Sequence, residues 1–225
     1  KYPIGMSGGR LEVETHIITA PNSYWQNLKK CVAQLGLNVY DVVFTGWASA
    51  TAVLTETEKE LGVTMLDIGA GTTSICIFKE GSIIYSGCIP LGGVNITSDI
   101  AIGLQVSSED AEKIKLNMDD LLSDKVKKDN KADKRPALLR KVEEEEDDKE
   151  KGDLLDLSPL GIKSEKKVTK DMLRKIVDAR CEEIFDMAKD SVEKSGYDIA
   201  MPAGIVLTGG TALLSGITKL TQSIF

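Results

Sequence analysis

One short stretch of the sequence combines the residue types that bind a phosphate group and a metal ion. Asp67 stands at the end of an apolar run, residues 64–68, and the small residues 69–73 (Gly-Ala-Gly-Thr-Thr) follow it. Glycine lets backbone amides approach an anion closely, and a row of such amides forms an anion-binding nest. A nearby carboxylate suits hydrated Mg²⁺, which keeps several of its waters. A plain turn between strands needs neither feature, so the stretch predicts a phosphate-binding turn.

Two further glycine pairs follow predicted strands, Gly92-Gly93 and Gly209-Gly210. The sequence contains neither G-x-x-x-x-G-K-[ST] nor G-x-G-x-x-G, which disfavours both a P-loop and a Rossmann fingerprint. The turn at 69–73 also joins two β-runs and does not open a helix. The geometry that remains is a β-hairpin whose tip holds phosphates.

The composition argues against several classes of function. The 225 residues carry a formal net charge of −7, whereas a general nucleic-acid binder is usually basic. One histidine, and four cysteines without a C-x-x-C pair, argue against an ordinary zinc site and indicate reduced thiols. No apolar run approaches the roughly 20 residues that span a bilayer, and no signal peptide opens the chain. The chain starts without methionine and stops inside an expected helix, so we expect a fragment.

Hydrophobic patterns predict the elements that position these residues. In the N-terminal part they predict strands at 11–20 and 39–44, a helix that begins at Asn22, and a helix at 48–61. The later part alternates strands and helices, which indicates the α/β class. Its expected elements are a strand at 63–68, a hairpin at 74–89, a helix carrying Ile96 and Ile100, a helix capped by Ser107, a long helix capped by Thr169, a strand at 204–207 and a helix from Thr211.

Residues 118–170 differ from the rest in their density of charge. They include the acidic run 143–148 and few large apolar residues. This composition predicts a solvated, mostly disordered insertion at about 118–160. An acidic docking tail or a calcium site is the alternative, although no EF-hand loop is present.

Three motifs resemble those of the actin-like ATPases, in the order that this superfamily has them. They are LDIGAGTTSICIF (66–78), a phosphate-binding hairpin; SSEDAEKIK (107–115), a ribose-contacting helix; and IVLTGGTALLSGI (205–217), an adenosine motif. The stretches VVFTGWASATAVLTETEKELGV, IPLGGVNITSDIAIGL and DMLRKIVDARCEEIF further resemble the FtsA family of bacterial cell-division proteins. The resemblance implies an actin-like (ribonuclease H-like) ATPase fold with two lobes, the second largely present.

The resemblance also implies a site for ATP and Mg²⁺. Asp67 would orient the waters on Mg²⁺, and the amides that would hold the β- and γ-phosphates belong to Gly69, Gly71, Thr72 and Thr73. A residue at the end of a strand can equally be a simple cap, and this alternative for Asp67 stays open.

For the nucleoside, the resemblance assigns Glu112 and Lys115, which share one helix face, to the ribose and the adenine edge. It assigns Gly209, Gly210 and Ala212 to the adenosine. The structural alternatives are a surface ion pair for Glu112 with Lys115 and an ordinary turn for Gly209 and Gly210.

The sequence departs from the family pattern at three positions. Ala70 replaces a glycine, which a negative φ would tolerate, and Ser74 replaces an acid. Thr45 stands near the position of the glutamate that is catalytic in other members, and a threonine is no general base near neutral pH. No residue is therefore assigned as catalytic, and we expect ATP binding with weak or no ATPase activity.

The family's organisation implies how the chain is divided. Residues 1–39 would end an inserted small subdomain that is specific to FtsA, and residues 40–62 would end the first lobe. Residues 63–96 and 197–225 would form the base of the second lobe. Residues 97–196 would be its outer part.

As a function, the resemblance implies a division protein in the cytoplasm at the inner face of the membrane. It would link FtsZ filaments to the cytoplasmic membrane through a C-terminal helix outside this chain, bind the FtsZ C-terminal tail, self-polymerise and recruit later division proteins. A small-molecule kinase and a pilus-assembly actin-like protein are the alternatives. A kinase would need a catalytic aspartate between the lobes, and Asp41 is the one candidate for it. The stretch VLTETEKELGV resembles division proteins more than pilus-assembly proteins.

Overall fold

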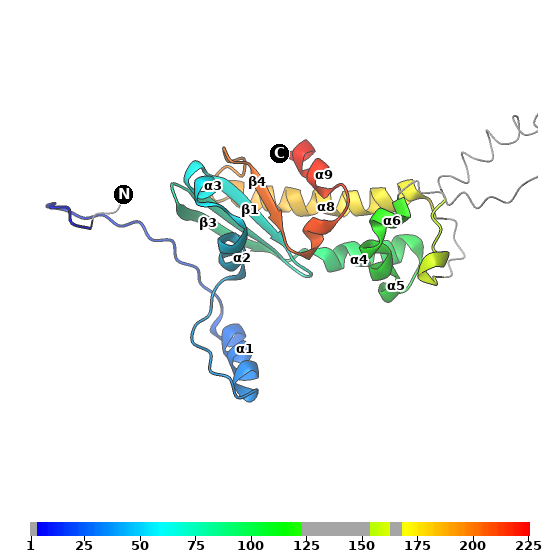
Figure 1. Ribbon diagram of the computed structural model, residues 1–225, viewed down its shortest axis with the longest axis horizontal. Coiled ribbons are helices and arrows are strands. Elements are labelled where there is room, and N and C mark those ends of the chain that lie inside the picture. The colour runs from blue at the N-terminus through cyan, green and yellow to red at the C-terminus, as the bar shows by residue number, and fades with distance from the viewer. Residues whose placement is uncertain (1–3, 123–153, 163–167) are drawn as a thin grey trace, which may run out of the picture.

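A four-stranded mixed sheet forms the centre of the molecule (Figure 1). The computed structural model describes residues 4–122, 154–162 and 168–225. The described helices and strands are α1 (Asn22–Gln34), α2 (Thr45–Val53), α3 (Glu56–Leu61), β1 (Val63–Ile68), β2 (Thr73–Lys79), β3 (Ser82–Ile89), α4 (Gly93–Leu104), α5 (Ser108–Leu116), α6 (Met118–Leu122), the 3₁₀ turn η1 (Ser158–Leu160), α8 (Lys170–Glu193), β4 (Ile205–Thr208), the 3₁₀ turn η2 (Gly210–Leu213) and α9 (Ile217–Ile224). The strand order is β3-β2-β1-β4.

The central strand β1 explains why the sheet has a core on each face. It pairs antiparallel with β2 and parallel with β4, so both of its edges are bonded. Because successive side chains of a strand point to opposite faces, Leu66 and Ile68 enter the larger hydrophobic cluster, and Val63 and Met65 enter the smaller one. Helices α2 and α3 pack on the side of the smaller cluster, and α8 packs on the other side. The α/β prediction is confirmed.

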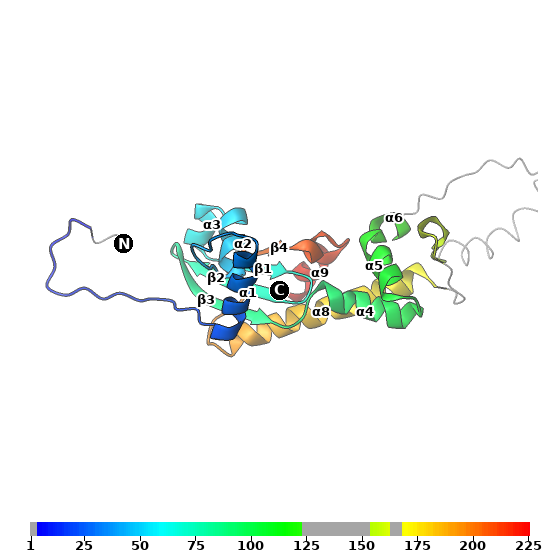
Figure 2. The same cartoon turned by 90° about the horizontal axis from the view of Figure 1, so that it is seen from below.

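Beyond one end of the sheet, α4, α5 and α6 form a helical extension along α8 (Figures 1 and 2). The guanidinium of Arg180 on α8 donates two hydrogen bonds, of 2.5 and 2.9 Å, to the carboxylate of Asp99 on α4. Ile100 and Leu104 of α4 are fully buried in the larger cluster. The base of the extension, where α4 begins, lies at the glycine turn that follows β3.

The two strands predicted in the N-terminal part are wrong. Residues 11–20 and 39–44 have no regular secondary structure, and the side chains of Leu11 and Val13 are 69% and 73% exposed. A strand needs a neighbour to accept its backbone hydrogen bonds, and no described strand pairs with these segments. The helix predicted from Asn22 is present as α1, because a helix makes its hydrogen bonds internally.

The single helix predicted at 48–61 is two helices. Leu54 adopts an extended backbone and ends α2, and Thr55 then starts α3. The hydroxyl of Thr55 accepts from the amide of Glu58, and the Glu58 carboxylate accepts from the amide of Thr55. This capping box satisfies the first amides of α3 and thereby fixes the break.

Some apolar residues at the two ends of the charged segment are packed against the core. Met118 at the start of α6, together with Leu155, Leu157 and Ile162, is buried in the larger cluster. The expectation of a solvated insertion at 118–160 therefore fails at both ends of that range. Its middle, including the acidic run 143–148, lies outside the described residues.

Candidate functional site

The three glycine turns of the sequence meet at one place. The amides of Gly93 and Val94, in the first turn of α4, donate to the carbonyl oxygens of Gly69 and Ala70 at 2.9 and 2.7 Å. The hydroxyl of Thr211 in η2 donates to the Gly69 oxygen at 3.3 Å. The turn between β1 and β2 is therefore held from two sides by its carbonyl groups.

Two of the glycines are required by this close packing. A Cβ at Gly92 would lie 2.6 Å from the carbonyl oxygen of Gly69, which no neighbour can relieve because the atom is backbone. Gly209 has a φ of +87°, and a Cβ there would lie 2.5 Å from the oxygen of Ile68. Packing alone therefore explains why glycine stands at positions 92 and 209.

Gly71 and Gly210 have no such explanation in the fold. Neither has a φ in the left-handed region, and a Cβ at either position would meet no atom within 4 Å. Both glycines therefore border open space. Ala70, the alanine in the middle of the turn, also avoids the left-handed region, so it is accommodated without strain.

Some backbone amides of the first turn donate hydrogen bonds within the protein and others do not. The Gly69 amide donates to the Thr72 oxygen at 2.9 Å, so it closes the turn itself. The Thr73 side chain is fully buried and its hydroxyl donates to the Leu91 oxygen at 2.9 Å. Within the described ranges, the amides of Gly71 and Thr72 donate to no protein acceptor, and both residues are exposed.

Asp67 is half-buried near the end of β1, two residues before the turn begins at Gly69. Its Oδ2 atom accepts a hydrogen bond of 2.6 Å from the hydroxyl of Ser49 on α2. Across the β1–β2 ladder Asp67 faces Ser74, whose hydroxyl lies 3.5 Å from that of Thr45. The sequence analysis did not single out Ser49. Its spacing of four residues from Thr45, one helical turn, is the signal that could have revealed it.

Lys115 and Glu112 of α5 lie at the second glycine turn and form a 2.7 Å ion pair. The Lys115 ammonium also donates to the Gly93 oxygen at 3.1 Å and to the Thr97 hydroxyl at 2.9 Å. Three internal acceptors thus occupy its three protons, and its side chain is only 11% exposed. Lys115 fastens α5 to the start of α4.

Glu112 is the more accessible partner, with 42% of its side chain exposed. Burial raises the pKa of Glu112, but hydrogen bonds from Lys115 and Thr97 outweigh that effect and bring the pKa below its usual value. The carboxylate is therefore ionised at neutral pH, and its Oε1 atom has no protein donor among the described residues.

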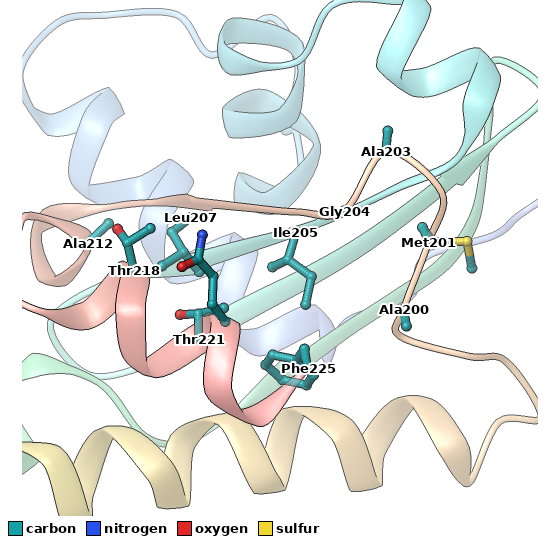
Figure 3. Close-up of a pocket in the computed structure, with 11 residues that line it drawn as sticks. Ala200, Met201, Ala203, Gly204, Ile205, Leu207, Ala212, Thr218, Thr221 and Phe225 are labelled. Carbon is teal, nitrogen blue, oxygen red and sulfur yellow. The ribbon is translucent and has the colours of Figure 1, made fainter.

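Ala212 points to a different side of η2. It lines a cavity of about 580 Å³ between β4 and α9, together with Ile205, Leu207, Thr218 and Phe225 (Figure 3). None of the other predicted site residues lines this cavity. The structure thus brings Asp67, the first turn, Gly209, Gly210, Glu112 and Lys115 together and places Ala212 at their edge.

The described part of the chain contains neither a cluster of metal-ligating side chains nor a helix that could span a membrane. No three or more His, Cys, Asp or Glu side chains gather there as a metal-binding group. No helix in that part combines the length and apolar composition needed to cross a membrane.

Comparisons with known proteins identify the family. The family model "Cell division protein FtsA" matches residues 64–225. The chain is 37% identical to the FtsA of Pseudomonas aeruginosa over 225 residues and 34% identical to that of Neisseria meningitidis over 226, and it covers 48% and 49% of these proteins.

The structure of MreB5 of Spiroplasma citri bound to AMPPNP matches with a TM-score of 0.62 at 20% identity, over 92% of this chain and 58% of that one. At this identity the match shows a shared fold, the actin-like ATPase fold. The chain spans about half the length of the curated relatives that it matches, and it belongs to the FtsA family of cell division proteins.

Proposed function

We propose that the chain forms the nucleotide-binding part of an ATP-binding, actin-like cell division protein. The observation that carries this proposal is the free amide pair of Gly71 and Thr72, in the turn that follows Asp67 along the chain and is held by the other two glycine turns. Free amides in an exposed turn form a site for phosphate oxygens. The MreB5 structure with the same fold has AMPPNP bound, and a second one has ADP bound, which supports a nucleotide as the ligand.

Each predicted residue takes a role that its surroundings allow. The amides of Gly71 and Thr72 bind the β- and γ-phosphates, and Gly210 leaves room for the nucleoside. The free Glu112 oxygen accepts from a ribose hydroxyl, whereas Lys115 holds α5 in place. Gly69 and Thr73 shape the turn and Ala212 borders the adenosine.

A magnesium ion fits this donor set only in hydrated form. Asp67 is the one carboxylate of β1 and its turn. The Ser49 hydroxyl bonds it, and Ser74 lies opposite it on β2. Mg²⁺ commonly keeps several waters and contacts one or two carboxylates besides the phosphates. When bound, the ion would neutralise phosphate charge, and Asp67 would orient its waters.

Hydrolysis is expected to be weak or absent. The first residue of α2, which faces β2 near the turn, is Thr45, and its hydroxyl cannot act as a general base near neutral pH. ATP then acts mainly as a structural ligand.

In the cell, we propose that the protein links FtsZ filaments of the division ring to the cytoplasmic membrane, self-polymerises and recruits later division proteins. Membership of the FtsA family supports this role. The relatives are about twice as long as this chain, so the membrane and partner contacts belong to the proposal for the whole protein. Co-sedimentation with FtsZ filaments, with and without the FtsZ C-terminal tail, tests the partner.

Calorimetry of Mg²⁺-ATP binding at full natural length tests the nucleotide site. We expect micromolar affinity and a loss of roughly tenfold, about 1.4 kcal/mol, in Asp67→Ala and in Gly210→Val. Valine at 210 meets open space, so it blocks the ligand without disturbing the fold. Gly9→Val is the matched control, because Gly9 also borders open space but lies far along the chain. Absence of ATP binding in the parent protein would remove nucleotide from the proposal.

A further inference from the structure

The hydroxyl of Ser49 makes the one hydrogen bond that the Asp67 carboxylate receives within the described chain. At 2.6 Å between Oγ and Oδ2, it has the length of a charge-assisted hydrogen bond. Ser49 lies outside the three glycine turns, on a helix that precedes β1. Among the described residues, the Ser49 hydroxyl makes no other hydrogen bond.

Close packing of α2 on the sheet brings Ser49 to this position. Gly46 of α2 is buried, and a Cβ there would lie 2.8 Å from the Cys76 sulfur of β2 and 2.6 Å from the ring of Phe44. A larger residue would lift the helix from the strand. Gly46 thus sets the distance at which α2 faces β1 and β2.

The helical period then places two hydroxyls over two neighbouring strands. Thr45 and Ser49 are one turn apart and share a face of α2. Asp67 and Ser74 are cross-strand partners on β1 and β2. Ser49 meets Asp67, and Thr45 meets Ser74, so the polar contacts form in register.

The carboxylate thus has a hydrogen bond at one oxygen and a close backbone neighbour at the other. Oδ2 is bound by Ser49, and Oδ1 lies 2.6 Å from where a Cβ of Gly209 would stand, so the Gly209 backbone packs against it. An aspartate at a strand end could otherwise rotate about its side-chain bonds. A fixed carboxylate loses less conformational freedom when it binds a hydrated cation.

We propose that Ser49 is a positioning residue that orients the Asp67 carboxylate toward the waters of the bound Mg²⁺. This inference rests on the proposed Mg²⁺-ATP site. Ser49 acts through Asp67 and touches neither the nucleotide nor the ion. Its removal therefore weakens the part of ATP binding that depends on Mg²⁺ and leaves the part that depends on the turn amides.

The test is calorimetry of ATP binding to the protein at full natural length, once with Mg²⁺ and once with EDTA. For Ser49→Ala we expect Mg²⁺-ATP affinity to fall about five- to tenfold, the upper part of the range for one ordinary hydrogen bond, with metal-free affinity within about twofold of the parent. Ser49→Thr, which keeps the hydroxyl, should stay close to the parent. Thr51→Ala is the control, since Thr51 is exposed on the same helix and bonds only the Trp47 oxygen.

A double-mutant cycle separates the roles further. In an Asp67→Ala background, Ser49→Ala should cause no additional loss of Mg²⁺-ATP affinity, because its target is gone. If Ser49→Ala does not fold, Ser49→Cys, a weaker donor of similar size, should show the same metal-dependent loss at smaller size.

Two results would overturn the inference while the nucleotide site stands. One is unchanged Mg²⁺-ATP affinity in Ser49→Ala, and the other is an equal loss with and without Mg²⁺. A parent protein that binds ATP neither with Mg²⁺ nor without it overturns the nucleotide site itself, and the role of Ser49 with it.

Discussion

The part of the chain from β1 onward and the part before α2 contain similar hydrophobic patterns, yet they end in different states. β1 is bonded at both edges and buries nearly all of its side chains. In contrast, α1 buries no residue. Residues 4–20 form a segment without strands that touches β3 through the 2.8 Å hydrogen bond between His16 and Ser86 and otherwise leads away from the sheet (Figure 2). The difference shows that an apolar pattern becomes buried structure only where a partner surface meets it.

The largest expected difference is between the stabilities of two variants, one truncated in the core and one truncated on the surface. Phe185→Ala removes a fully buried ring of α8 that contacts Phe225, and it should lower the free energy of unfolding by about 3–5 kcal/mol. Tyr24→Ala in α1, where the side chain is 74% exposed, should change it by about 0.5 kcal/mol or less. Urea denaturation measures both. Similar losses in the two variants would break the comparison.

A second pair separates two kinds of glycine within the candidate site. Gly92→Ala pushes a methyl group against the Gly69 carbonyl and should cost about 1–3 kcal/mol of stability. Gly71→Ala meets open space and should leave stability within about 0.5 kcal/mol while weakening ATP binding. Thermal unfolding combined with ATP titration of both variants provides the check. Loss of stability in Gly71→Ala would mean that the fold itself needs this glycine.

An effect of intermediate size is expected in the reactivity of the cysteines, which should differ between buried and exposed thiols. Burial, with a smaller effect of the Asp67 charge, raises the pKa of Cys76 to about 12. Burial likewise raises the pKa of Cys181 to about 12. Iodoacetamide at pH 8 should therefore label the exposed Cys31 and Cys88 first, as peptide mass spectrometry can show. Early labelling of Cys76 in the folded protein would contradict the packing of α2 on β2.

The smallest expected effect concerns pH and the contact between α4 and α5. The folded-state pKa of Glu112 lies below its ordinary value of 4.5, so its carboxylate adds stability that is complete above that value. This stability is lost as the pH falls through the lower folded-state pKa. Glu112→Gln should cost at most about 1 kcal/mol at pH 7, because the group is partly exposed.

The measurement is urea denaturation of parent and variant between pH 7 and pH 3. The difference between them should shrink below pH 4.5, toward the lowered pKa. A difference that stays constant down to pH 3 would show that the carboxylate charge plays no part.

The sequence predictions succeeded where a structure depends on neighbouring residues and failed where it needs a partner that is distant in the sequence. The caps at Ser107 and Thr169 were predictable because each depends on residues a few positions away. The strand at 63–68 was confirmed because β2 and β4 supply its partners. The strands at 11–20 and 39–44 failed because a period of two describes a face but supplies no neighbour.

The candidate site was predictable as a set of motifs and not as a set of contacts. The resemblance assigned residues 69–73 and 209–210 to one site, and hydrogen bonds from Gly93 and Thr211 to the Gly69 oxygen bring the three glycine turns together. The sequence could not show that the Gly69 amide donates to Thr72 within the turn or that the Lys115 ammonium bonds the start of α4. It also could not show that Ser49 bonds Asp67. The last two facts depend on the approach of α5 and α2, which residues distant in the sequence decide, and the first depends on the exact conformation of the turn.

The most direct test of the central claim is hydrogen exchange of the amides of Gly71 and Thr72. Both lack a protein acceptor and are exposed, so peptides that cover them should exchange rapidly in the absence of ligand. On addition of Mg²⁺-ATP we predict slower exchange at these two amides, with little change in peptides from α1. Bound ATP with unchanged exchange at residues 71–72 would contradict the account, since the phosphates would then lie elsewhere.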